Sequence, residues 1–204
     1  MDLLREMILS GELAPGDRLR QDELAARFDV SSTPICEAIQ QMVAEGVLSH
    51  SPYHGVQIAE ITLEDIREIY FIRSAVKELA TRTAVPNLRI TDVKHLHEYK
   101  AAIRQSVEAA DFQTLRKLNY EFHWLIYYTA GMQHLSQIIR GLWLKSPWDR
   151  LHGMPNRPEE AIIEHERLLK AVYARDAQLS RSWMHEHIEH SAHTLSEYLT
   201  ERPL

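Results

Sequence analysis

Apolar residues recur at helical spacing along most of the chain, and near the amino terminus two short apolar clusters are joined by a polar turn. Within residues 22–48 the first cluster holds Leu24, Ala25 and Phe28. The second follows the i, i+3, i+4, i+7, i+8 pattern of one face of an amphipathic helix, with Ile35, Ala38, Ile39, Met42 and Val43. The turn between them reads Ser31-Ser32-Thr33-Pro34. Two helices joined by so short a turn are typical of a helix-turn-helix.

The residues around this pattern extend the prediction. Thr33 is expected to cap the second helix, with Pro34 in the first helical position, where its missing N–H costs nothing. Gly46 is placed to end the helix in a left-handed conformation. Residues 47–58 are predicted to form a two-stranded ribbon around a turn-rich tip. The pattern therefore predicts a winged helix-turn-helix, and a helical hairpin followed by a loop is the alternative.

Beyond residue 61 the apolar spacing is helical, and no stretch alternates as a strand does. Thr62 is expected to cap the first helix, with Glu64 and Asp65 favourably placed against its dipole. Pro86 ends that helix, and further helices are predicted at about 91–109, 111–130, 132–146, 157–174 and 176–199. We predict a mainly α protein, with a winged helix-turn-helix domain at residues 1–60 and an all-α antiparallel helical bundle at residues 61–204.

Composition narrows the class of protein. A content of 45% hydrophobic and 25% charged residues is ordinary for a soluble globular chain. The single cysteine allows no intrachain disulfide. No run approaches the roughly 18 apolar residues of a membrane helix, and the early acids do not fit a signal peptide. These features predict a cytoplasmic protein with no membrane partner.

The charge is unevenly distributed. Residues 1–58 hold four basic and nine acidic residues, a net charge of −5. The whole chain carries −6, so residues 59–204 carry only −1. DNA binding draws much of its affinity from Lys and Arg on phosphates. The segment with the DNA-binding pattern is therefore the acidic part of the chain.

The motifs of residues 1–58 resemble those of a known family. After an opening helix at residues 2–10 come SGELAPGDRL, DELAARFDVSSTPICEAI, EGVL and a His-Gly wing tip. This order and spacing resemble the GntR family of bacterial transcription regulators, which implies a DNA operator as partner. Where the family usually has arginines, this chain has Ser32 and Cys36. Our candidate DNA contacts are Arg20, Ser31, Ser32, Thr33, Cys36, Gln40, His54 and Gly55. A sensor that keeps the fold and has lost DNA binding is the alternative.

Three histidines lie on the apolar stripes of three different predicted helices. His123 shares its face with Phe122 and Ile126, and Asn119 precedes it by one helical turn. His165 and His187 lie on the stripes of the last two helices. An i, i+4 pair supplies adjacent ligands, and facing helices supply the others. We therefore hypothesise a metal site, and the alternative is a set of core histidines that are each satisfied by a hydrogen bond.

Residues 62–199 resemble the FCD ligand-binding domain of the FadR branch of the same family. The matching positions are Arg73 in an apolar stripe of the first helix, Asn119 with His123, the Glu164-His165-Glu166 segment, and His187. The resemblance implies that Asn119 and the three histidines bind a divalent metal, and that an organic acid completes its coordination beside Arg73. This chain has Asn119 where Asp is commoner and Lys77 where the family usually has Glu. Taken without the resemblance, Arg73 also fits a salt bridge or an edge residue.

Together these predictions indicate one function. We expect a homodimeric transcription regulator whose two winged domains bind a double-stranded, pseudo-palindromic operator. A small carboxylate effector at Arg73 and a zinc ion, with nickel or manganese as alternatives, would control it. A metal-dependent enzyme is the rival from another class. It lacks an evident general base, because Glu164 and Glu166 are predicted to point away from the face of His165.

Overall fold

The computed structural model describes residues 2–51, 55–146, 151 and 154–201. Its amino-terminal elements are α1 (Asp2–Ser10), β1 (Arg18–Leu19), α2 (Gln21–Phe28), α3 (Ser32–Ala44), β2 (Leu48–Ser51) and β3 (Gly55–Ile58). These are followed by α4 (Leu63–Ala84), the short 3-10 helix η1 (Val85–Asn87), α5 (Ile90–Glu108), α6 (Phe112–Thr129), α7 (Gln133–Leu144), α9 (Arg157–Tyr173) and α10 (Ala177–Glu201). The chain is therefore mainly helical, as predicted.

The first part of the chain is a winged helix-turn-helix. Helix α3 buries Ile35, Ala38, Ile39 and Met42 and leaves its polar face exposed, so the predicted amphipathic face is confirmed. Strands β2 and β3 pair antiparallel, with Leu48 opposite Ile58, and form the predicted ribbon. Its tip at residues 52–54 lies outside the described residues. Strand β1, which the sequence pattern did not predict, pairs antiparallel with β3 in the order β1-β3-β2. Two residues are too few to show the alternation of a strand.

The predicted start of α3 is wrong by two residues. The helix begins at Ser32, with Ser31 in the capping position but without a side-chain capping hydrogen bond, and Pro34 is the third helical residue. The first four N–H groups of a helix have no acceptor within it, so proline is tolerated throughout the first turn. Thr33 therefore does not cap the helix. The prediction for Gly46 holds, since its φ of +68° lies in the left-handed region just past the helix end.

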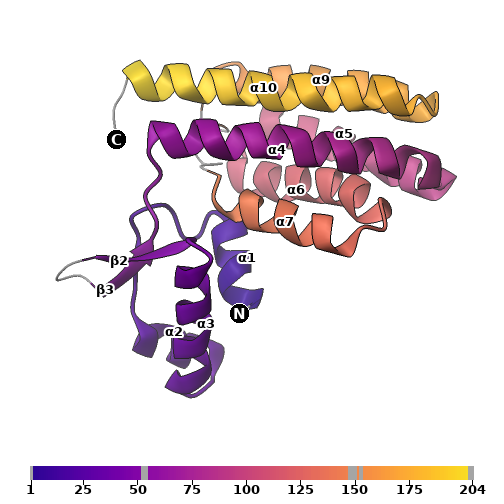
Figure 1. Cartoon of the computed structure of the whole chain (residues 1–204). Helices are drawn as coiled ribbons and strands as arrows, with labels where there is room; N and C mark the ends of the chain where they lie inside the picture. The colour runs from indigo at the N-terminus through magenta and orange to yellow at the C-terminus, as the bar shows by residue number, and fades with distance from the viewer. Residues whose placement is uncertain (1, 52–54, 147–150, 152–153, 202–204) are drawn as a thin grey trace.

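The remaining helices form the predicted bundle. Thr62 caps α4 through a capping box, in which its hydroxyl accepts from the N–H of Asp65 and the Asp65 carboxylate accepts from the N–H of Thr62. Helix α10 runs along α4, α5 packs on α6, and α9 contacts both α10 and α5 (Figure 1). In the same view α1 lies against the bundle below α7, α2 and α3 lie lower in the picture, and strands β2 and β3 lie to the left. Helix α1 contacts α6 and α7.

Two clusters of buried apolar side chains follow this arrangement. The larger fills the bundle and includes Tyr70, Phe122 and Trp143. The smaller fills the winged part, where α1, α3 and the sheet meet. It also takes in Leu144 from the end of α7, so consecutive residues of one helix belong to the two cores. Among the described helices, none combines the length and apolar content that crossing a bilayer requires.

Candidate metal centre and nucleic-acid interface

Three helices of the bundle bring three histidines together. His123 on α6, His165 on α9 and His187 on α10 are all buried, and each offers a ligand atom within 4.8 Å of the others. The Nε2 atoms of His123 and His165 are 3.1 Å apart. Two nitrogens that bind one zinc ion tetrahedrally at 2.0–2.1 Å lie about 3.3 Å apart. The spacing of the imidazoles therefore fits a shared divalent ion.

The local sequence explains why these side chains meet. On α6, Asn119, Ile126 and Tyr127 each lie three or four residues from His123 and are also buried, so the histidine lies on the inward stripe. His165 lies one turn from Ile162 and Leu169, which are buried on α9. His187 has the same relation to Met184 and Ser191 on α10. The inward position of each histidine is therefore set by helical periodicity.

Asn119 lies beside the same centre. It is buried, and it lines a small cavity together with His165 and His187. The structure thus brings the four predicted ligands into one region of the bundle. An amide oxygen adds no negative charge to the three imidazoles, so the ligand set is neutral before a metal binds.

Glu164 contacts this centre, which corrects the prediction that it points away from it. Its Oε2 accepts a hydrogen bond from Nδ1 of His187 at 2.6 Å, and its Oε1 lies 2.5 Å from Nδ1 of His190. Arg157 donates to the same carboxylate at 2.9 Å. Although Glu164 is adjacent to His165, it faces α10, which packs on α9. A carboxylate on one imidazole nitrogen fixes the tautomer and leaves the other nitrogen for a metal.

Burial favours the neutral form of the imidazoles of His123 and His187. Burial holds the pKa of His123 well below its usual value, and the neighbouring His165 and His187 add to the effect. Burial also lowers the pKa of His187, although Glu164 opposes this shift. Burial alone would raise the pKa of Glu164, but the hydrogen bond from His187 and nearby positive charges lower it to about 2. Neutral imidazole is the form that binds a metal.

Arg73 and Lys77 lie next to the histidines in an aromatic niche. Both are buried on α4. The Arg73 guanidinium stacks 4.2 Å from the Tyr70 ring, and the Lys77 ammonium lies 4.2 Å from the Trp143 ring. The Trp143 ring lies 5.7 Å from that of His123. Burial holds the pKa of Lys77 well below its usual value, and the charge of Arg73 lowers it further. Arg73 is therefore an interior residue and does not reach the solvent as an edge residue would.

The predicted DNA contacts lie on the outer face of the winged part. Ser31, Ser32, Thr33 and Gln40 are exposed, and Cys36 is half-buried. The amide of Gln40 donates to Cys36 Sγ at 3.7 Å. Arg20 is exposed and forms an ion pair with Glu23 at 2.9 Å.

The wing supplies Gly55, which is exposed at the start of β3, whereas His54 lies outside the described residues. No lysine or arginine occurs between Arg27 and Arg67 in the sequence. The outer face of α3 is therefore polar but not basic.

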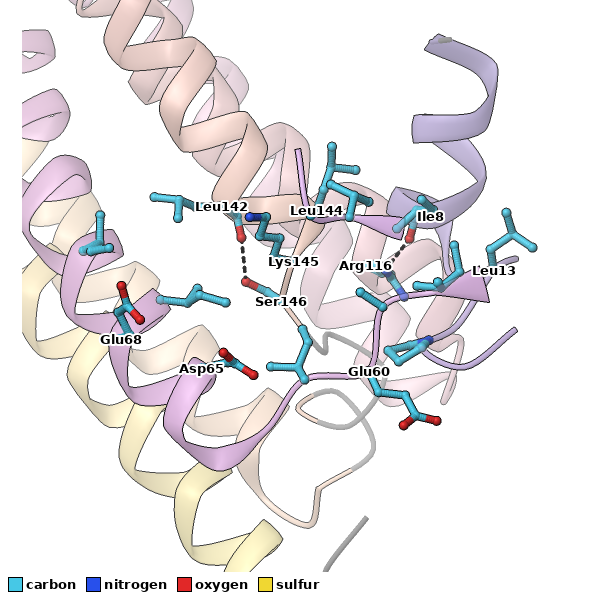
Figure 2. Close-up of a pocket in the computed structure, with 18 residues that line it drawn as sticks. Ile8, Leu13, Glu60, Asp65, Glu68, Arg116, Leu142, Leu144, Lys145 and Ser146 are labelled. Carbon is cyan, nitrogen blue, oxygen red and sulfur yellow. Dashed lines mark hydrogen bonds between the residues drawn. The ribbon is translucent and has the colours of Figure 1, made fainter. Parts of the chain in front are cut away.

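A pocket of about 320 Å³ separates the winged part from the bundle (Figure 2). Its walls come from α1, from the segment at residues 58–61, from α4 and from the end of α7. Arg116 donates to the backbone oxygen of Ile8 and so ties α6 to α1 (Figure 2). The Lys145 ammonium lies 3.2 Å from the position that a Cβ atom at Gly46 would take. The two parts are thus in contact through α1 and the end of α7, and this pocket lies between them.

Comparison with known proteins agrees with this architecture. Residues 1–58 match the bacterial regulatory proteins of the gntR family, and residues 68–190 match the FCD domain. The HTH-type transcriptional regulator McbR of Escherichia coli (strain K12) is 29% identical over 188 residues, which cover 90% of this chain and 85% of that protein. The HTH-type transcriptional regulator YdhC of Bacillus subtilis (strain 168) is 28% identical over 204 residues, which cover 97% of this chain and 90% of that protein.

The solved structure of Escherichia coli McbR/YncC superimposes with a TM-score of 0.87 at 28% identity, covering 97% of this chain and 95% of that one. These relatives are named as transcription regulators and not as enzymes. The winged helix-turn-helix, the helical bundle and the two family matches lead to one conclusion: the chain belongs to the GntR family of DNA-binding transcription regulators and carries an FCD domain.

Proposed function

We propose that a small organic acid, bound at a divalent metal in the bundle, controls the binding of this regulator to its operator. The observation that carries the proposal is the convergence of His123, His165 and His187 within 4.8 Å. Buried polar groups cost free energy unless they are hydrogen-bonded or bind a metal. Asn119 is the fourth proposed ligand. The neutral, nitrogen-rich set suits zinc best, with nickel and manganese as alternatives.

The effector is proposed to be a carboxylate because cations lie beside the histidines. Arg73 is buried, and although burial is the main cause of the lowered pKa of His123, the charge of Arg73 makes a smaller contribution to it. A guanidinium binds carboxylates through charge-assisted hydrogen bonds. Stacking on Tyr70 holds the Arg73 side chain in place, so the group is positioned before the effector arrives.

Helix α7 supports a route from this centre to the DNA-binding part. Trp143 contacts His123 and Lys77, whereas Leu144, the next residue, packs in the winged core. Lys145 then reaches Gly46, at the end of α3. The pocket in Figure 2 leaves room beside these contacts. A shift of α7 on effector binding would therefore move the winged part relative to the bundle.

The regulator is proposed to act as a homodimer. Two winged domains would read the two halves of a pseudo-palindromic operator. Helix α4 exposes three large apolar side chains, Phe71, Ile72 and Leu79, and Phe71 is 77% exposed. Such side chains favour an interface with a second copy of the chain.

The metal centre is tested by elemental analysis of protein purified without a histidine tag. We expect about one divalent ion per chain, and we expect the double variant His123→Ala with His187→Ala to lose it. The variant His134→Ala, which removes an exposed histidine on α7, serves as the control and should retain the ion. A stoichiometric ion in the double variant would show that these histidines are not the ligands.

A further inference from the structure

A small cavity lies against the histidines, between α6, α9 and α10. Its polar wall consists of Asn119, Arg157, His165, His187 and Ser191, and the rest of its wall is apolar and includes Ala161. Its volume is about 30 Å³. A single water requires about 10–15 Å³ on this measure. The cavity therefore has room for about two or three heavy atoms, which is the size of one functional group and not of a whole metabolite.

Arg157, which lines this cavity, has a buried donor that is not used. The side chain is 4% exposed. Its Nη2 donates to Glu164 at 2.9 Å and to Ser191 Oγ at 2.7 Å. Its Nη1 is buried and has no hydrogen-bond partner among the described residues. A buried donor without an acceptor carries a desolvation cost that an anion in the cavity would remove.

The net charge around the cavity depends on whether a metal is bound at the histidines. The carboxylate of Glu164 forms an ion pair with Arg157 at 2.9 Å and so balances its charge. The other polar groups that line the cavity are the amide of Asn119, the hydroxyl of Ser191 and two imidazoles, and imidazole is neutral in the form that binds a metal. Without a metal the region is therefore close to neutral. A divalent ion at the proposed centre would make it positive and favourable for an anion.

We propose that this cavity is a subsite for one carboxylate group, held by Nη1 of Arg157 next to the metal centre. The subsite is distinct from the niche of Arg73, which does not line the cavity. A carboxylate has three heavy atoms and accepts hydrogen bonds from a guanidinium. A phosphate or sulfate has five and exceeds the available space. This subsite rests on the proposed function, because it requires the metal.

The test is a calorimetric titration of metal-loaded protein with formate, the smallest carboxylate. We expect formate to bind the metal-loaded chain and to bind the metal-free chain at least tenfold more weakly. The variant Arg157→Lys should lower the affinity by about tenfold or more, because it loses a charge-assisted hydrogen bond to the anion. Ala161→Leu should abolish binding by filling the cavity while leaving every charge in place.

The controls separate this subsite from loss of fold and from failure of the proposed function. Arg181→Lys changes a half-exposed arginine that pairs with Glu78, and it should bind formate as the wild type does. Elemental analysis of each variant reports whether the metal centre is intact. Metal-loaded protein whose formate affinity is unaffected by Arg157→Lys and Ala161→Leu would overturn the subsite alone. Equal competition by phosphate would overturn its assignment to a carboxylate. A wild-type chain without metal would overturn the proposed function and the subsite together.

Discussion

At the scale of single residues, Glu164 links the candidate ligand His187 to its surroundings. Its carboxylate accepts from Nδ1 of His187 at 2.6 Å, and the same group receives Arg157. Outer-shell carboxylates of this kind orient a ligating imidazole and increase its basicity. Glu164 therefore orients His187 for metal binding only because α9 packs on α10.

Replacement of this carboxylate should weaken metal binding without removing a ligand. We expect Glu164→Gln to lower zinc affinity by about 10–100-fold, because the amide keeps the shape of the side chain but not its charge. Competition with a chromophoric chelator measures the effect. Glu160→Gln is the matched control, since Glu160 approaches the exposed His190 at 3.6 Å and is not a hydrogen-bond partner of His187. Equal affinities in the two variants would exclude an orienting role for Glu164.

At the scale of elements, helix α7 joins the two hydrophobic cores. Trp143 packs in the bundle and Leu144 in the winged part, because consecutive residues of a helix point about 100° apart. A short helix that is fixed at both contacts cannot turn without disturbing one of them. Interiors are close-packed, so such a contact transmits displacement.

We therefore expect Leu144→Ala to uncouple the metal centre from DNA binding. Truncation of a buried leucine costs about 2–5 kcal/mol at a well-packed site, so the melting temperature should fall. The decisive measurement is the ratio of operator affinities with and without metal and effector, which should approach one in the variant. Ile138→Ala, at a 51% exposed position of α7, should keep the wild-type ratio. A wild-type ratio in Leu144→Ala would argue against this route.

At the scale of the whole molecule, the acidic winged part limits the affinity for DNA. Residues 1–58 carry a net charge of −5, and no lysine or arginine occurs between Arg27 and Arg67. Phosphate neutralisation by cations supplies most non-specific affinity, and each contact steepens the salt dependence. This regulator should therefore bind its operator specifically but modestly.

A salt titration on a selected operator tests this expectation. The logarithm of the affinity changes by roughly 0.9 per phosphate contact for each logarithmic unit of salt. We expect a shallow slope for the wild type. Ser32→Arg with Cys36→Arg should bind more tightly and with a steeper slope, since each new charged contact contributes about 1–3 kcal/mol. Glu37→Gln changes the charge of the same helix without adding a cation and is the control. Tight wild-type binding with a steep slope would show that other cations approach the DNA.

Local patterns were enough to predict most elements. The apolar spacing of residues 35–43 predicted the inner face of α3, and Thr62 with Asp65 predicted the start of α4. The inward positions of Asn119, His123, His165 and His187 followed from the same periodicity. Such features depend on neighbours within about one helical turn, so the sequence by itself determined them. The short strand β1 was not predicted because two residues are too few to show the alternation of a strand. The first residue of α3 was predicted wrongly because Ser31, Ser32 and Thr33 are all residues that can cap a helix.

Only the tertiary structure decided which side chains meet across helices. Glu164 lies one residue from His165, yet it binds His187 because α9 packs on α10. Arg157 faces the cavity because Glu164 and Ser191, on two different helices, hold the same nitrogen. Leu144 joins the winged core because α7 ends against it. Each of these contacts joins separate segments of the chain, and its geometry depends on how helices pack, which no local periodicity encodes.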